Sequence, residues 1–233
     1  MIFFKPNREK DCSTVLFAGV IAAAILLFVY PAPGFFISPD IPCSLLIYNS
    51  IAGIIFILFT VLMMHFSDDQ TSLKEILCID IPDKKTISTV LTSLPCLLVA
   101  VSAITWHWKF TLKELNIPFE EKQLLFQYTD TADGIILLII MTVFIAPVTE
   151  ELLFRRVIFS FIGKFTTANI AGFITAGIFA AVHNFTAGVP GLFLMGLTFQ
   201  WIFSKTSNIA ASVLLHMLCN LAAIIFYCIF PVS

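Results

Sequence analysis

The stretch GIILLIIMTVFIAPVTEELLFRR, residues 134–156, decides the fold class, because it joins a long apolar run directly to four charged side chains. A bilayer core needs about 20 apolar residues per helix, and the run from Gly134 to Thr149 supplies most of one. The helical pattern then continues past Glu150 and Glu151 to about Phe161. Since an ionisable group inside an apolar span costs several kcal/mol, this stretch indicates a membrane protein that keeps a charged cluster in its helical bundle.

The composition supports a membrane protein. Hydrophobic residues make up 59% of the 233 residues and charged residues 12%, whereas soluble domains have about half and a quarter. The net charge is −2 and no basic stripe occurs, so a nucleic-acid partner is not expected. The six cysteines are scattered without a C-x-x-C pair, which argues against a zinc finger or a disulfide framework.

Further apolar segments predict an all-α fold, a polytopic transmembrane helical bundle of about seven to eight helices with the active site in the late helices. The basic residues before the first segment also suit a signal peptide, but its apolar run is long for one. Residues 67–85 read as a surface loop or an interfacial helix, and a further amphipathic helix is expected on the membrane around Leu112–Leu125. Besides the run at 134–161, the expected spans are 13–30, 45–64, 86–106, 166–183, 190–203 and 209–230.

The distribution of basic residues predicts the orientation. With the N-terminus inside and seven spans, ten of the 13 Lys and Arg residues lie on the cytoplasmic side, and Lys109, Lys113 and Lys122 lie outside. We divide the chain into N-terminal transmembrane helices and loops, residues 1–130, and a catalytic core of helices, residues 131–233.

The first polar motif is E-E-x-x-x-R at 150–155. Glu151 and Arg155 are four residues apart in the favourable order, so they are expected to pair. Glu150 projects about 100° away and suits a general base. Pro147 lacks an N–H and is expected to free the carbonyl of Val143. The alternative is that both glutamates sit at the cytoplasmic interface, with the nearby basic residues as anchors.

Two further motifs place polar groups on late helices. Phe179 and His183 are one turn apart, on a helix with small residues at four-residue spacing that would let a neighbour approach closely. His216 and Asn220 share a face in the middle of the last span. The alternatives are a histidine at a helix end and interhelical hydrogen bonds that only stabilise the bundle.

E-E-x-x-x-R, F-x-x-x-H and H-x-x-x-N, in this order on successive apolar helices between about Gly134 and Phe230, resemble the CPBP family. This family comprises CAAX proteases, bacteriocin-processing enzymes and Rce1-type intramembrane endopeptidases. The resemblance implies a helical membrane fold with a cavity open to one side of the bilayer, and peptide hydrolysis by a glutamate-activated water. It implies Glu150 as base, His183 as its assistant, His216 and Asn220 as donors to the developing oxyanion, and Glu151 with Arg155 as a supporting pair.

The expected partners are a peptide or protein substrate at the membrane and the bilayer itself, most simply the bacterial cytoplasmic membrane. Substrates would be CAAX peptides, or peptides of the pheromone, leader or bacteriocin kind. Members of the family are often called metalloproteases, and the side chains of Glu150, His183 and His216 are of the kinds that zinc accepts as ligands. We do not expect an obligatory metal, and a catalytic one stays open. The alternatives are a non-catalytic membrane protein of the same fold, such as an immunity factor or scaffold, and a transporter or proton relay.

Overall fold

The computed structural model describes residues 14–25, 43–67, 78–119, 131–183 and 186–230. Over these residues the chain forms seven helices, counting the continuous rod at 132–162 once, and a short 3-10 turn, η5 (Thr186–Gly188). The helices outside the rod are α1 (Thr14–Ala24), α3 (Ser44–Ser67), α5 (Lys84–Glu114), α9 (Ala168–Val182), α10 (Val189–Thr206) and α11 (Ile209–Ile229).

The rod runs through the middle of the bundle, and two π-helical segments interrupt its α-helix. Its segments are α6 (Ala132–Ile139), the π-helix η3 (Ile140–Ile145), α7 (Ala146–Glu151), the π-helix η4 (Leu152–Ile158) and α8 (Phe159–Ile162). A π segment holds an extra residue in its turn and is frequent at functional sites. The two π segments flank α7, which carries both glutamates.

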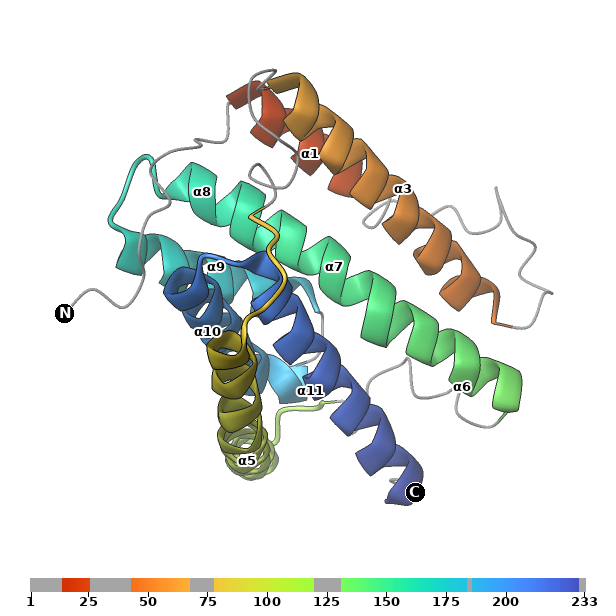
Figure 1. The fold of residues 1–233 in the computed structure, drawn as a ribbon. Helices are drawn as coiled ribbons and strands as arrows, with labels where there is room; N and C mark the ends of the chain where they lie inside the picture. The colour runs from red at the N-terminus through yellow and green to blue at the C-terminus, as the bar shows by residue number, and fades with distance from the viewer. Residues whose placement is uncertain (1–13, 26–42, 68–77, 120–130, 184–185, 231–233) are drawn as a thin grey trace.

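The other helices pack on the rod from two sides, as Figure 1 shows. Helices α1 and α3 lie together along one side, and α3 contacts η3 and α7. Helices α9, α10 and α11 lie on the other side with α5, and α11 contacts both η3 and α7. The glutamates on α7 therefore face a layer formed by the late helices.

The stripe of small residues on α9 has the effect predicted from its spacing. A Cβ added to Gly196 of α10 would lie only 3.1 Å from the Cα of Ala176. The two helices thus meet backbone to backbone, as small residues permit.

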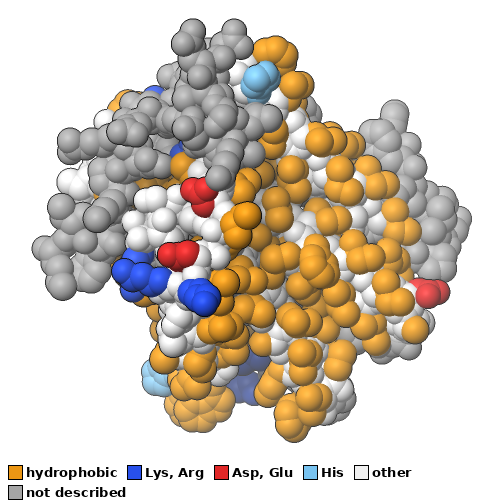
Figure 2. Space-filling view, viewed as in Figure 1, with side chains coloured by type: hydrophobic (Ala, Val, Ile, Leu, Met, Phe, Trp, Pro, Cys, Tyr) orange, Lys and Arg blue, Asp and Glu red, His pale blue; other side chains and the backbone are white. Residues whose placement is uncertain are grey.

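The outer surface of the protein is apolar. Hydrophobic side chains cover the larger part of the described surface in Figure 2. Large ones stand exposed on several helices, such as Leu58, Phe173 and Phe226. Soluble monomers rarely expose such broad apolar patches. Within the described part of the chain, four helical segments are long and apolar enough to cross a membrane: 44–66, 84–114, 132–162 and 209–229. The protein is an integral membrane protein with a polytopic helical bundle, and the prediction of the fold class is confirmed.

One prediction of a helix boundary is wrong, and two other predictions are not tested by the structure. The third expected span was to end at Trp106, but α5 continues to Glu114, so the expected amphipathic helix at 112–125 is wrong at its start. Leu112 is buried in the last turn of α5, and the chain leaves the helix at Leu115. Seven crossings with the N-terminus inside stay a prediction. The domain boundary after residue 130 also stays one, because residues 120–130 lie outside the described part.

Candidate active site

Glu151 and Arg155 form a buried ion pair, as the sequence predicted. The Arg155 Nε lies 3.0 Å from the Glu151 Oε2, and both side chains are fully buried. The Arg155 Nη2 also donates to the carbonyl oxygen of Gly196 at 3.3 Å. A buried charge is tolerated only when it is paired and hydrogen-bonded, so this pair links the rod to α10 and keeps both charges compensated.

An aromatic cage surrounds the guanidinium of Arg155. The carbon centre of this group lies 5.9, 5.4 and 5.7 Å from the rings of Phe154, Phe179 and Phe199, within cation–π range. Phe199 also stacks on His216, with ring centroids 4.6 Å apart. The cage therefore fixes both the arginine and the histidine beside it.

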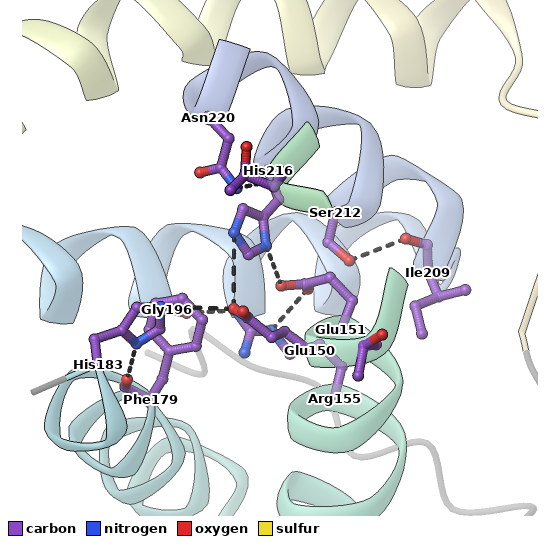
Figure 3. A network of polar contacts seen from close by, with 12 residues as sticks. Glu150, Glu151, Arg155, Phe179, His183, Gly196, Ile209, Ser212, His216 and Asn220 are labelled. Carbon is purple, nitrogen blue, oxygen red and sulfur yellow. Dashed lines mark hydrogen bonds and ion pairs between the residues drawn. The ribbon is translucent and has the colours of Figure 1, made fainter. Parts of the chain in front are cut away.

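Glu150 lies where three helices meet. Its Oε2 is 3.7 Å from the Nε2 of His183 at the end of α9, and 3.8 Å from the Nε2 of His216 on α11. Figure 3 shows the three side chains converging. The side chains of Glu150 and His183 are 25% and 24% exposed, whereas Glu151 is fully buried. The adjacent glutamates thus have separate environments: the side chain of Glu150 is partly exposed, although its Oε2 is buried and has no hydrogen-bond partner among the described residues, and Glu151 is fully buried.

The contact made by Nδ1 of each histidine shows which ring nitrogen carries the hydrogen. The Nδ1 of His183 lies 2.6 Å from the carbonyl oxygen of Phe179, which can only accept, so this nitrogen carries the hydrogen. The Nδ1 of His216 lies 3.2 Å from the Oε1 of Glu151 and donates to it when that carboxylate is ionised. In the neutral ring each Nε2 is then a lone pair facing Glu150. The Oε2 of Glu150 and the two Nε2 atoms are then all acceptors, and none of the three supplies a hydrogen to these contacts.

Asn220 extends the cluster toward η3. Its Nδ2 donates to the carbonyl oxygen of Thr142 at 2.7 Å, and it lies one turn beyond His216 on α11 (Figure 3). A primary amide has two hydrogens, so a second donor remains. The sequence predicted that Pro147 frees the carbonyl of Val143, which would be its acceptor in an α-helix. In the π register the N–H of Ala146 bonds to the carbonyl of Met141, so the N–H that Pro147 lacks would have gone to Thr142, five residues before it.

The expectation that a catalytic metal stays open at this cluster is not tested by the structure. Two imidazole nitrogens and a carboxylate are ligands that zinc accepts. However, among the residues that the structure describes, no group of three or more His, Cys, Asp or Glu side chains could hold a metal ion together.

Sequence reasoning missed two contributors, Phe199 and Thr142. Phe199 is one of 25 phenylalanines and belongs to no motif, so no signal in the chain distinguishes it. Thr142 acts through its backbone. Its distance of five residues from Pro147 becomes informative only when the π register is known.

The comparisons with known proteins agree with this region. Residues 132–222 match the family model "Type II CAAX prenyl endopeptidase Rce1-like". The chain is 31% identical over 99 residues to "Putative membrane peptidase YdiL" of Bacillus subtilis, a match that covers 41% of this chain and 39% of that protein. It is 33% identical over 93 residues to "Membrane-embedded CAAX protease MroQ" of Staphylococcus aureus, covering 37% and 38% of the two chains.

A third relative is "UPF0177 protein YxdF" of Lactococcus lactis, 35% identical over 78 residues, which are 33% of this chain and 42% of that one. No solved structure matches the chain at a significant level. The matches span about two fifths of the length of these curated relatives. Over residues 132–222 the chain is therefore similar to Rce1-like membrane endopeptidases of the CPBP family.

Proposed function

We propose that this protein is an intramembrane endopeptidase in which Glu150 activates a water molecule for attack on a peptide bond. One observation carries the proposal: the carboxylate of Glu150 and the Nε2 atoms of His183 and His216 meet at 3.7 and 3.8 Å, from three different helices of an apolar bundle. Ionisable groups inside a membrane bundle are costly and are functional by default.

A water molecule completes this arrangement chemically. Both separations exceed a direct hydrogen bond, so we place a bridging water between these groups. A water about 2.8 Å from both Glu150 and His183 would give each acceptor one hydrogen, and its oxygen lone pair would then point toward a peptide carbonyl. Glu150 takes the proton as the bond forms, and the protonated carboxyl delivers it to the leaving amine. His183 holds the water and is itself held by the carbonyl of Phe179.

The developing oxyanion needs hydrogen-bond donors in a site with little water. His216 donates from Nε2 when its ring is doubly protonated, since its Nδ1 faces Glu151. Asn220 offers the amide hydrogen that Thr142 does not accept. Glu151, held by its ion pair with Arg155, orients the ring of His216 through the Nδ1 contact. Neither residue of the pair touches the substrate.

The proposed substrates are peptides that enter from the membrane, of the CAAX-processing or the peptide- and bacteriocin-maturation type. The bacterial relative MroQ is named as a membrane-embedded CAAX protease, and the family model is that of a prenyl endopeptidase. Because these relatives are bacterial, the proposed location is the plasma membrane.

The test uses the full chain purified in lipid nanodiscs with a panel of C-terminal and leader peptides. Glu150→Gln keeps the shape of the side chain but removes the base, and cleavage should fall by at least about 100-fold while the thermal unfolding midpoint is kept. Glu114→Gln, at the exposed end of α5, is the matched control and should cleave like wild type.

Full cleavage by Glu150→Gln would refute the role of Glu150. A folded wild-type protein that cleaves no peptide in the panel would favour a non-catalytic membrane protein of the same fold. Bound metal is measured on the same samples, and cleavage that requires stoichiometric zinc would replace the proposed mechanism by a metal-assisted one.

A further inference from the structure

The peptide chain between Met141 and Pro147 has one backbone acceptor that its own helix does not satisfy. In η3 the N–H of Ala146 donates to the carbonyl of Met141, five residues back. The next N–H in that register would come from residue 147 and would bond to Thr142. Residue 147 is proline and has no N–H, so the helix leaves the carbonyl of Thr142 without a backbone donor.

The amide of Asn220 fills this position. Its Nδ2 lies 2.7 Å from the carbonyl oxygen of Thr142, across 78 residues of sequence. The assignment of the amide is unambiguous, because a carbonyl only accepts and the Oδ1 of asparagine cannot donate. Buried carbonyls are nearly always paired, so α11 supplies from outside the partner that the rod lacks.

The register of η3 determines where Glu150 points. A π segment inserts one residue into the helix, and one residue corresponds to a rotation of about 100°. If η3 became an α-helix, everything after it would turn by about that angle relative to α6. Glu150 would then leave the space that it shares with His183 and His216.

We propose that Asn220 is a positioning residue that holds η3 in its π register, and thereby aims Glu150 at the two histidines. In an α-helix Thr142 would accept from Ala146, and Pro147 would leave the carbonyl of Val143 without its donor instead. The hydrogen bond from Asn220 satisfies the acceptor that lacks a donor in the π register, and so favours that register. This role rests on the proposed function for its effect on cleavage, but the bond and the register are independent of it.

The structure provides a specific rescue. Pro147→Ala restores an N–H that can donate to Thr142 in the π register, five residues back. Asn220 should then become dispensable for the register. Four proteins are compared in nanodiscs: wild type, Asn220→Ala, Pro147→Ala and the double variant. Asn220→Asp is added because it keeps the volume of the side chain but replaces the donor by an acceptor.

An unpaired polar group costs enough to shift an equilibrium by about 5- to 150-fold when it is buried, and for the partly buried carbonyl of Thr142 we expect the lower end. Asn220→Ala and Asn220→Asp should therefore lower both the unfolding midpoint and kcat when Pro147 is present. In the Pro147→Ala background, Asn220→Ala should change the midpoint little, and the loss in kcat should shrink to the part due to its second amide hydrogen. KM should stay the same in both backgrounds.

The unfolding midpoints decide the result even if no variant cleaves. An equal loss of stability for Asn220→Ala in the two backgrounds would overturn the proposal, and so would an equal loss of kcat, which is the result expected if Asn220 acts only as an oxyanion donor. If wild type cleaves nothing but the stability effects are coupled, the proposed function fails and the role of Asn220 in the register stands.

Discussion

Replacing Arg155 by methionine should destabilise the protein strongly, because it leaves Glu151 charged and buried. The side chain of Arg155 lies 3.0 Å from Glu151, and both are fully buried. Removing one partner of such a pair costs about 3–5 kcal/mol. His216 remains 3.2 Å from Glu151 and compensates part of the charge, so we expect the lower end, about 3 kcal/mol.

The assay is equilibrium unfolding of the purified protein in mixed micelles, followed by circular dichroism. A loss of about 3 kcal/mol is more than a roughly 100-fold change in the unfolding equilibrium constant. Arg155→Lys is the control. It keeps the charge but loses the planar group that contacts Glu151 and Gly196, so its loss should be smaller. The error of such extrapolations is about 1 kcal/mol. A methionine variant whose free energy of unfolding lies within that range of wild type would refute the view that the two charges are shielded from water and stabilise each other.

A second substitution separates stability from positioning. Adding Glu151→Leu to Arg155→Met removes the uncompensated charge, and replacement of a whole buried ion pair by apolar groups is often neutral. The double variant should therefore be more stable than Arg155→Met alone. The double variant should nevertheless lose cleavage, because the Nδ1 of His216 no longer has its acceptor. Recovery of cleavage together with stability would show that Glu151 has no part in orienting His216.

Two further predictions concern helix contacts away from the chemistry. Gly196→Ala should destabilise the protein by about 1–3 kcal/mol, because the added Cβ would lie 3.1 Å from the Cα of Ala176. Gly177→Ala is the control and should not destabilise it, because no atom of the described residues lies within 4 Å of that Cβ. Equal thermal unfolding midpoints for the two variants would contradict this prediction. At the start of α5, hydrogen bonds from the side chain and backbone of Thr86 hold the pKa of Asp83 below its ordinary value, so its capping contribution is complete above the ordinary pKa and disappears as the pH falls through the lowered one. Amide exchange at Thr86 should therefore accelerate on acidification relative to an Asp83→Asn variant, and parallel behaviour of the two proteins down to about pH 3 would contradict the cap.

Local pattern in the sequence was enough for the membrane fold and for one contact of the site. The length of an apolar run reports directly on the thickness of a bilayer, so most helices appear where expected. The pair of Glu151 and Arg155 follows from spacing alone, since residues four apart are neighbours on any α-helical face. The small residues of α9 likewise predicted a close neighbour, although they could not say that it is α10.

The tertiary structure decided the rest, for two physical reasons. Contacts between helices depend on packing and not on local period, so only the fold shows that Glu150, His183 and His216 meet or that Phe199 stacks on His216. The helical register is also a tertiary property here. An α and a π turn of the same residues look alike in sequence, so only the structure shows that the N–H missing at Pro147 would have gone to Thr142 in the π register. Glu150 and Glu151 are adjacent in the chain, but packing separates them into a partly exposed carboxylate beside two histidines and a buried one paired with Arg155.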